Sequence, residues 1–368
     1  MNKLKRILCI LSNMNTGGAE TFLMKIYRQL DKENYQMDFC LNQDDNFYAD
    51  EIQKMGGQIH IIPSKSENLN GFKKKLYDLV KSNKYQYVLR ITSNAAGFMD
   101  LMVAKKAGAE ICAVRSSNSS DGSGLKTKIA HRIGRILYDR YVDVRMAPSV
   151  LAAEYTFGNG KVKSNCVDFL NNGVDLDIYK FSQIARNEKR QEFSIDNKFV
   201  IGHIGRFMTQ KNHMFLLDVF YEIVKKRSDA VLLLVGGNGD LEEKVRTKIN
   251  DLNLQDKVVF AGIRSDVPEL LSAMDVFVMP SLYEGMPNTI IEAQATGLPC
   301  VIADTITREA NITGLVDYLS LSSAPSYWAD KVVSLSELER RNTHDDFVTN
   351  GYDIESVANK FIKLVCGE

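Results

Sequence analysis

Short apolar runs alternate along this chain with segments of helical length. The runs of the first half are RILCILS, YQMDFCL, QIHIIP, YQYVLRIT and EICAVRS, and segments such as 19–30 and 72–81 lie between them. The runs of the second half are KFVIGHIGRF, AVLLLVGG, KVVFAG, VFVMPS and PCVIAD, each followed by a segment of helical length. Strands that alternate with helices predict parallel sheets covered by helices, so the expected fold class is α/β.

The alternation weakens over residues 169–197, which are polar and rich in turn residues, and then begins again. A chain of 368 residues is long enough for two domains. We expect one α/β domain over 1–170, a second over 171–351, and an amphipathic helix within 352–368. Ligands of open parallel sheets bind at the carboxyl ends of the strands, so the loops there are expected to face a shared cleft.

Composition excludes several classes of protein. Lys and Arg number 46 and Asp and Glu number 46, so no overall basic field argues for binding nucleic acid. Six cysteines without a C-x-x-C pair indicate reduced thiols and a cytoplasmic protein. The first apolar run is too short for a signal peptide or a membrane span, so we expect any membrane contact to be peripheral.

Two glycines follow the first predicted strand, in SNMNTGGAETF. Gly17 and Gly18 allow positive φ angles and the close approach of a ligand, and Ala19 and Glu20 are expected to open a helix whose N-terminus suits an anion. A tight turn without a ligand is the alternative. Neither this loop nor LLLVGGNGDLEEK carries G-x-G-x-x-G, which argues against a nicotinamide enzyme.

Two cations follow the first strand of the second half, in IGHIGRFMTQKNHMFLL. Arg206 and Lys211 lie before an apolar helix, where they could neutralise a diphosphate. The alternative is a solvated surface pair.

The stretch SLYEGMPNTIIEAQATGLPC holds two glutamates around a predicted helix start. Pro287 suits the first helical position, and the following amides of Asn288 and Thr289 would then hold a phosphate. Glu284 would face the group attached to that phosphate, and Glu292 could accept both hydroxyls of a ribose. A loop charge and a solvated helical residue are the alternatives.

A resemblance now becomes specific. The segments NTGGAETF, NNGVD, GRFMTQKN and VFAGIRSDVPELLSAMDVFVMPSLYEGMPNTIIEAQATGLPCV follow one another in the order typical of glycosyltransferase family 4. They span about 17–301, and the last is most similar to bacterial enzymes of capsular or exopolysaccharide assembly. The resemblance implies a GT-B fold, in which two Rossmann-like domains face a cleft and the last helix crosses back to the first domain. It also implies a nucleoside-diphosphate sugar as donor and retention at the anomeric carbon. We expect UDP as the nucleotide, and no metal because Arg206, Lys211 and the helix N-terminus supply the positive charge.

The resemblance also assigns residues. Arg206 and Lys211 match the diphosphate-binding cations, Glu284 the glutamate at the donor sugar, and Glu292 the ribose glutamate, while Gly18 lies near the phosphates and the acceptor. The expected catalytic residues are Glu284, Arg206 and Lys211. The full donor site expected comprises Gly18, Arg206, Lys211, Gly237, Ile263, Arg264, Glu284, Gly285, Met286, Pro287, Asn288, Thr289 and Glu292, with the backbone of Ile263 and Arg264 at the base.

One departure concerns the first domain. Many family members carry a histidine after the strand that matches EICAV, where this chain reads RSSNSSDGSG. Arg115, Ser116, Ser117 and Asn118 occupy this region. The expected acceptor-binding residues are Gly17, Ser116, Ser117 and Asn118. Two histidines of the second half, His203 and His213, are more typical of structural positions.

Two further patterns leave alternatives open. Asp175 and Asp177 form a D-x-D pattern in the expected linker, and we expect no metal there. Residues 124–141 form a basic amphipathic segment, which could pack on the core or contact anionic lipid or a lipid diphosphate.

The expected function is therefore a retaining glycosyltransferase at the inner face of the cell membrane. It would move a hexose or N-acetylhexosamine to a glycan acceptor, with a polyprenyl-diphosphate-linked glycan as the expected type. The alternatives are a UDP-sugar epimerase of the same fold and a non-catalytic sugar-nucleotide binding protein.

Overall fold

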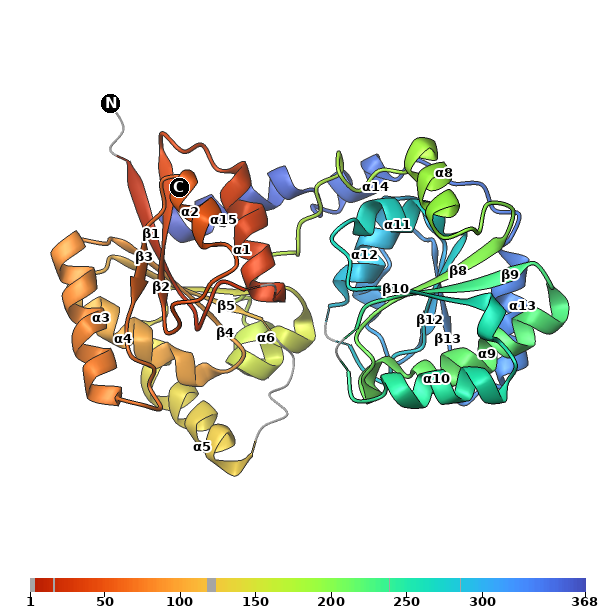
Figure 1. The fold of residues 1–368 in the computed structure, drawn as a ribbon. Helices are drawn as coiled ribbons and strands as arrows, with labels where there is room; N and C mark the ends of the chain where they lie inside the picture. Colours follow the sequence, from red (N-terminus) through yellow and green to blue (C-terminus); the bar gives the residue numbers. More distant parts are fainter. Residues whose placement is uncertain (1–3, 16, 118–123, 238, 285) are drawn as a thin grey trace. The chain divides into compact units, whose positions relative to one another are not determined.

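The computed structural model describes residues 4–15, 17–117, 124–237, 239–284 and 286–368. The chain forms two compact units, Met1–Gly173 with Gly351–Glu368, and Val174–Asn350. Each unit is a parallel sheet with helices on both faces (Figure 1), so the predicted α/β class is confirmed. No helix in the described part of the chain is long and apolar enough to cross a membrane.

The sheet of the first unit has seven strands in the order β3-β2-β1-β4-β5-β6-β7, all paired in parallel. The short strands β6 and β7 were not among the predicted runs. The strands are β1 (Lys5–Ile10), β2 (Tyr35–Leu41), β3 (Ile59–Ile61), β4 (Tyr87–Thr92), β5 (Ile111–Ser116), β6 (Val144–Ala147) and β7 (Asp168–Phe169).

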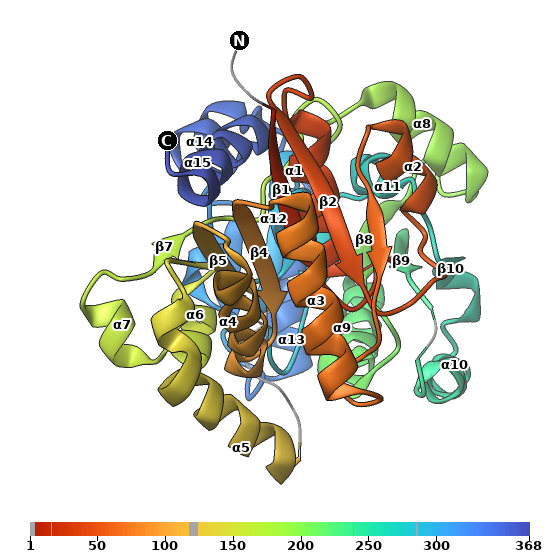
Figure 2. The same cartoon turned by 90° about the vertical axis from the view of Figure 1, so that its left-hand side faces the viewer.

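Both faces of this sheet are buried because alternate side chains of its strands enter different cores. Ile7 and Cys9 pack with α1 (Gly18–Gln29) and the terminal helix α15 (Ile354–Cys366). Leu8 and Ile10 pack with helices of the other face (Figure 2). The terminal helix thus returns to the first unit, as the resemblance implied. The remaining helices are α2 (Ala49–Lys54), α3 (Leu69–Asn83), α4 (Phe98–Ala107), α5 (Leu125–Ile133), α6 (Val150–Phe157) and α7 (Asn159–Lys163).

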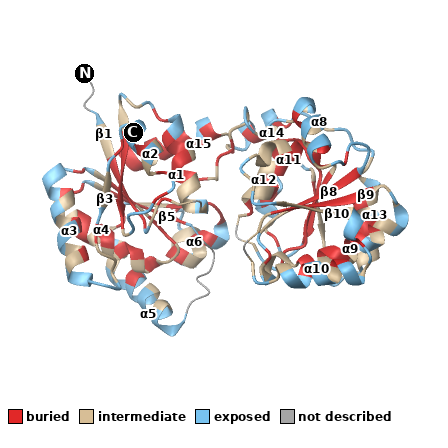
Figure 3. Ribbon diagram, in the orientation of Figure 1, coloured by how far each residue is buried: buried red, intermediate tan, exposed pale blue. Residues whose placement is uncertain are grey.

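The sheet of the second unit has six parallel strands in the order β10-β9-β8-β11-β12-β13. Its strands are largely buried (Figure 3), as expected where helices cover both faces. The strands are β8 (Phe199–Ile204), β9 (Ala230–Val235), β10 (Val258–Gly262), β11 (Val276–Met279), β12 (Cys300–Ala303) and β13 (Val316–Leu319). The helices are α8 (Gln183–Glu192), α9 (His213–Lys226), α10 (Glu242–Asp251), α11 (Val267–Ala273), α12 (Asn288–Ala295), α13 (Pro325–Ser334) and α14 (His344–Thr349).

Helix α8 lies in the stretch that the sequence predicts as a turn-rich linker. Ser182 caps it by accepting a hydrogen bond from the amide of Ala185. Arg186 and Arg190 on this helix bind Asp275 at 2.5 Å and 2.7 Å. The helix is therefore held by ion pairs, which apolar periodicity does not detect.

Candidate functional site

Glycines bring three loops together at the carboxyl edge of the second sheet. Gly205 follows β8, Gly236 and Gly237 follow β9, and Ile263 follows β10. A Cβ atom on Gly236 would lie 2.2 Å from the carbonyl oxygen of Gly205, and one on Gly237 would lie 3.1 Å from Cγ1 of Ile263. Gly236 also has a φ of +134°, which side chains disfavour. Larger residues would force these loops apart.

Lys211 and Glu284 form the centre of this edge. Lys211 Nζ lies 2.7 Å from Glu284 Oε1, and the two side chains are only 19% and 10% exposed. Gln210 Nε2 contacts the other carboxylate oxygen at 3.2 Å and the carbonyl oxygen of Tyr283 at 3.0 Å. The amide of Leu282 donates to the carbonyl of Gln210 at 2.8 Å. The loop after β8 is thus joined to the segment before α12, and both oxygens of Glu284 have partners.

Arg206 supplies a second cation on the same loop. Its side chain is exposed and has no hydrogen-bond or ion-pair partner among the described residues. Its carbonyl oxygen accepts from the amide of Met208 at 2.7 Å, which fixes the turn. The guanidinium group is therefore available to an anionic ligand.

Helix α12 begins one residue later than the sequence predicts. Pro287 is its N-cap, with φ −80° and ψ 99°, and is not the first helical residue. Its carbonyl oxygen accepts hydrogen bonds from the amides of Ile290 and Ile291 at 3.1 Å and 3.3 Å, as the carbonyl of an N-cap residue does. Asn288 and Thr289 still form the first turn, at the positive end of the helix dipole. Met286 precedes the cap and is half-buried.

Glu292 lies on α12 with a partner from the start of the second unit. Tyr179 makes a side-chain hydrogen bond to Glu292, and the pKa of Tyr179 is raised by burial and then by the charge of this carboxylate. Glu292 is half-buried. The hydrogen bond from Tyr179 therefore helps to orient its carboxylate.

Arg264 is committed elsewhere by its side chain. It binds Asp266 through two hydrogen bonds of 2.7 Å and 2.5 Å and pairs with Glu192 at 2.9 Å. The side-chain hydrogen bond to Asp266 raises the pKa of Arg264. Only its backbone remains for a ligand, while the neighbouring Ile263 is 69% exposed and offers an apolar surface.

The glycines of the first unit differ from the expectation. Gly17 is the N-cap of α1 with φ −118° and ψ 168°, and neither Gly17 nor Gly18 has a positive φ. The helix begins at Gly18, not at Ala19. A Cβ atom on Gly17 would lie 2.2 Å from Glu20 Oε2, whereas one on Gly18 would meet nothing within 4 Å. The expected positive φ is therefore not the reason for either glycine.

Ser116 and Ser117, at the end of β5, have different surroundings. Ser116 is fully buried and bonds to Thr156 Oγ1 at 2.6 Å and to the carbonyl oxygen of Ala152 at 3.2 Å, so its expected role in acceptor binding is wrong. As the last residue of β5 it faces α6. Ser117 is exposed and lines a cavity of about 330 Å³ at the carboxyl edge of the first sheet. Asn118, like Gly285 of the expected donor site, lies outside the described residues.

This cavity was missed by sequence reasoning. Ser12 follows β1, Arg90 and Thr92 belong to β4, and Lys65 comes from the loop after β3. The arginine inside the apolar run YQYVLRIT, followed by polar residues, was the available signal.

Arg115, His203 and His213 have structural positions. Arg115 is buried, contacts Asn172 Oδ1 at 2.5 Å and lies 3.6 Å from the ring centre of Phe22. His203 is buried and its Nδ1 contacts the carbonyl oxygen of Val278 at 2.8 Å. Burial lowers the pKa of His213 to about 4, with a further contribution from the charge of Lys211. Burial also lowers the pKa of His203, so both imidazoles are neutral near pH 7.

The aspartates of the D-x-D pattern do not converge. Asp175 Oδ1 accepts from the amides of Asp177 and Ile178 at 3.1 Å and 3.2 Å, which closes a turn. The Asp177 side chain is almost fully exposed and lies 3.7 Å from Lys180. The described ranges contain no group of three or more His, Cys, Asp or Glu that could hold a metal ion.

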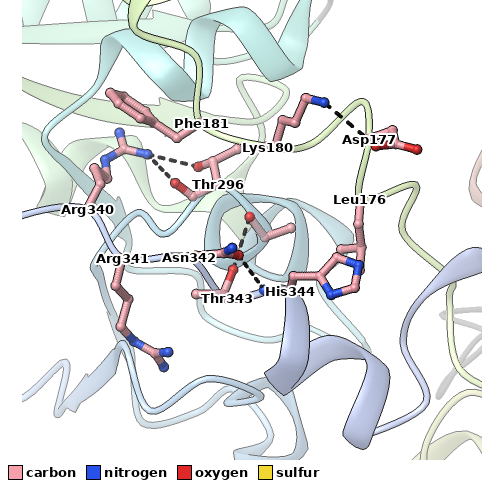
Figure 4. A pocket seen from close by; sticks show the side chains of 11 residues that line it. Leu176, Asp177, Lys180, Phe181, Thr296, Arg340, Arg341, Asn342, Thr343 and His344 are labelled. Atoms are coloured by element: carbon pink, nitrogen blue, oxygen red, sulfur yellow. Dashed lines mark hydrogen bonds and ion pairs between the residues drawn. The ribbon is translucent and has the colours of Figure 1, made fainter.

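A separate cavity of about 390 Å³ lies at the opposite end of α12 (Figure 4). Arg340 there donates to the carbonyl oxygens of Thr296, Leu271 and Met274, and burial lowers its pKa to about 9. These carbonyls terminate α12 and α11. Arg340 therefore stabilises two helix C-termini, and the cavity is separate from Lys211 and Glu284.

The basic segment is a short helix with an exposed apolar row. Helix α5 is followed by a π-helical turn over Gly134–Tyr138 and a 3₁₀ turn over Asp139–Tyr141. No residue of α5 itself is buried. The large apolar side chains exposed along α5 and the π-helical turn are those of Leu125, Ile129, Ile133, Ile136 and Leu137.

Comparison with known proteins gives a consistent result. The sequence profile of the family described as glycosyl transferases group 1 matches residues 198–337. The chain is 34% identical over 363 residues to the glycosyltransferase EpsF of Bacillus subtilis (strain 168), covering 95% of this chain and 94% of that protein. It is 28% identical over 312 residues to the UDP-Gal:alpha-D-GlcNAc-diphosphoundecaprenol alpha-1,3-galactosyltransferase of Escherichia coli, covering 78% and 77%.

A solved structure supports the fold over the full length. Anabaena Alr3699/HepE in complex with UDP and glucose matches with a TM-score of 0.78 and 18% identity, covering 100% of both chains. At this identity the match establishes the GT-B fold alone.

Proposed function

The chain belongs to the glycosyl transferases of group 1, and from this membership we propose that it moves a hexose or N-acetylhexosamine from a UDP-sugar to a lipid-linked glycan. The reaction would serve polysaccharide assembly, in line with the motifs of 281–300. One observation carries the proposal. Arg206, whose side chain has no partner among the described residues, lies with Lys211, Glu284 and the N-terminus of α12 at the carboxyl edge of one sheet.

The donor assignment rests on the chemistry of this edge. A nucleoside diphosphate needs cations and amides for its phosphates, an acceptor of hydrogen bonds for its ribose and an apolar surface for its base. Arg206 and Lys211 supply the cations, Glu292 the carboxylate and Ile263 the apolar surface. The uracil nucleotide is supported by the name of the Escherichia coli relative and by the UDP bound to the Anabaena protein.

The proposed reaction retains configuration at the anomeric carbon. The bond from this carbon to the donor phosphate oxygen breaks, a bond to the acceptor hydroxyl oxygen forms on the same face, and the hydroxyl proton passes to the leaving diphosphate. Negative charge grows on the diphosphate, so fixed cations stabilise the transition state more than the ground state. Glu284 would face the positive charge that develops on the sugar.

Lys211 has a second task in this proposal. In the unliganded protein it neutralises Glu284 at 2.7 Å. An incoming diphosphate competes for the ammonium group and leaves Glu284 with less compensation, next to the developing positive charge of the sugar. Donor binding would therefore weaken the ion pair and leave the negative charge of Glu284 available to the sugar.

We propose that no divalent metal takes part. Asp175 is used to close a turn, and protein cations supply the positive charge at the phosphates. Activity is expected to persist in excess EDTA. Loss in EDTA with recovery in manganese would assign the charge compensation to a metal.

The acceptor and the membrane belong to the first unit in this proposal. The Escherichia coli relative is named for an acceptor attached to diphosphoundecaprenol. Such an acceptor resides in a membrane, and the exposed apolar row of α5, flanked by basic residues, suits an anionic lipid surface. The protein would then act at the inner face of the cell membrane.

A ligand screen with product analysis tests the function. UDP-sugars should raise the melting temperature more than GDP- or ADP-sugars, because ligands that bind the native state stabilise it. With a glycan acceptor, the product should keep the donor's α configuration by proton NMR. An epimerase would instead convert UDP-sugar without any acceptor, and a non-catalytic protein would bind it unchanged.

A further inference from the structure

A buried carboxylate in the first unit holds two cations. Asp100 on α4 is fully buried. Its Oδ1 lies 2.5 Å from Lys65 Nζ and its Oδ2 lies 3.0 Å from Arg90 Nε. The contact with Arg90 is an ion pair without hydrogen-bond alignment, since Arg90 Nε finds no hydrogen-bond partner. One carboxylate thus serves two partly buried cations.

The donors of the two cations are only partly used. Arg90 Nη1 donates to the carbonyl oxygen of Ile10 at 2.8 Å, whereas Nη2 has no hydrogen-bond partner in the described part of the chain. Among the described residues, Lys65 Nζ has one polar contact, with Asp100, and lies 5.1 Å from the ring centre of Phe72, although an ammonium group carries three donors. Burial lowers the pKa of Lys65, and the neighbouring charge of Arg90 lowers it further against the opposing effect of Asp100. Lys65 and Arg90 together carry two positive charges, and Asp100 supplies one negative charge, so one positive charge remains uncompensated.

These donors face the cavity of about 330 Å³ at the carboxyl edge of the sheet. Hydroxyl groups surround it, because Ser12, Thr92, Ser93 and Ser117 line its walls. Gly97 keeps it open. A Cβ atom there would lie 2.7 Å from Thr92 Oγ1 and 3.1 Å from Arg90 Nε.

Glu20 is the only carboxylate among the described residues that line the cavity, because Asp100 lies behind Lys65 and Arg90. Its Oε2 is turned toward Gly17 at the start of α1. Glu20 makes no ion pair with Lys65 or Arg90, because neither cation contacts a carboxylate other than Asp100 within the described ranges. The excess charge of the cations is therefore left to a ligand.

The basic helix α5 contacts the same region. His131 Nδ1 accepts from the amide of Ala95 at 3.0 Å, and a Cβ atom on Gly134 would lie 2.0 Å from the carbonyl oxygen of Ala95. Ala95 begins the 3₁₀ turn Ala95–Gly97, whose Ala96 and Gly97 line the cavity. The 3₁₀ turn Ala95–Gly97 thus lies between α5, with its exposed apolar row, and the cavity lined by Lys65 and Arg90.

We propose that Lys65 and Arg90 bind the phosphate or diphosphate group of the acceptor in this cavity. The inference rests on the proposed function, because it assigns the anionic end of the acceptor to a site on the first unit. An oxyanion would accept hydrogen bonds from both cations and from the hydroxyl groups, and it would neutralise the excess positive charge. A lipid held at α5 would place its phosphate at the depth of the neighbouring turn.

Titration of inorganic diphosphate into UDP-saturated protein tests the site directly, because UDP occupies the donor site. Isothermal titration should detect salt-dependent binding to the wild type and to Lys74→Gln, which removes an exposed charge on α3. Lys65→Gln leaves Arg90 and Asp100 as a balanced pair and should weaken diphosphate binding about ten-fold or more. Lys65→Arg keeps the charge and should retain binding.

The outcomes separate this inference from the proposed function. Equal diphosphate affinity in Lys65→Gln and the wild type, or none in a wild type that binds UDP, would overturn the cavity assignment alone. Failure to bind UDP would overturn the donor site instead. Glucuronate is titrated in parallel, and binding of glucuronate without diphosphate would contradict a phosphate site. The far-UV circular dichroism spectrum and the melting temperature of Lys65→Gln, both expected to match the wild type, verify that this variant is folded.

Discussion

Lys211 Nζ and Glu284 Oε1 lie 2.7 Å apart although 73 positions separate the two residues in the chain. The pair joins the loop after β8 to the segment before α12. Both partners belong to the expected donor site, so in the unliganded protein the cation proposed to bind the phosphates is paired with the carboxylate proposed to face the sugar.

Replacing Glu284, the acidic partner of this pair, should change UDP affinity and kcat in opposite directions. Glu284→Gln frees Lys211 for the diphosphate, so UDP affinity should rise a few-fold, within the range of a partly buried ion pair. The same change should lower kcat by roughly 100-fold, because a charge at the reacting sugar is lost. Isothermal titration and initial rates measure the two effects, and full kcat in the variant would remove Glu284 from the reacting centre.

Removing the cations should affect turnover more than stability. Arg206→Ala is expected to lower kcat/KM by roughly 100-fold, the scale of one lost donor at a developing anion. Arg206 is exposed and has no side-chain partner in the described chain, so its free energy of unfolding should stay near the wild-type value. Lys244→Ala, an exposed change on α10, is the matched control. Equal kcat/KM in the two variants would show that Arg206 does not meet the phosphates.

The ribose assignment of Glu292 predicts a loss of sugar discrimination. Glu292→Gln should weaken UDP binding and raise the donor KM more than it lowers kcat, because the contact exists in ground and transition states alike. Affinity for 2′-deoxy-UDP should fall less, so the ratio of the two affinities moves toward one. Tyr179→Phe should shift this ratio in the same direction by a smaller amount, because Tyr179 orients the carboxylate. An unchanged ratio in Glu292→Gln would place the ribose elsewhere.

The buried histidines predict acid sensitivity of the fold. The pKa of His213 is about 4 in the folded protein and near 6.5 in the unfolded chain. Between these values the unfolded chain binds a proton that the folded state excludes. The contribution of His213 to the free energy of unfolding is therefore fully present above about pH 6.5. It falls by roughly 3 kcal/mol as the pH decreases toward 4. Urea unfolding at a series of pH values should give a flatter profile for His213→Gln, whereas His344→Gln, a change at an exposed histidine, should follow the wild type.

The exposed row of α5 predicts binding to anionic vesicles. Replacing Lys126, Lys128, Arg132 and Arg135 by Gln should weaken sedimentation with phosphatidylglycerol vesicles, and the wild-type binding should fall as salt rises. UDP affinity is the control and should not change. Salt-independent binding, or none in the wild type, would limit α5 to a structural role.

The sequence predicts the longer elements and the loops that follow them. Each long apolar run became a strand because both faces of these parallel sheets are buried, which leaves a continuous apolar signature. The short strands β6, β7 and β13 have too few buried positions for such a run. The hydrophobic pattern did not predict helix α8, because contacts of Arg186 and Arg190 with Asp275, and not an apolar stripe, hold this helix in place.

The site was less accessible to sequence reasoning than the fold. Loop glycines and charged residues mark the carboxyl edges, but the ion pair of Lys211 with Glu284 depends on where two distant loops meet. The direction in which Ser116 points follows from its register in β5, which the motif does not specify. Lys65, Arg90 and Asp100 come from three separate elements, and no spacing rule connects them.

The central claim is that Arg206 and Lys211 recognise the diphosphate of the donor. Isothermal titration of UDP and of uridine into the wild type and the Arg206→Ala/Lys211→Ala double variant tests it, since the two ligands differ only in the diphosphate. The wild type should bind UDP at least about 100-fold more tightly than uridine, and the double variant should bind both with similar affinity. A double variant that keeps the wild-type preference for UDP would contradict the account.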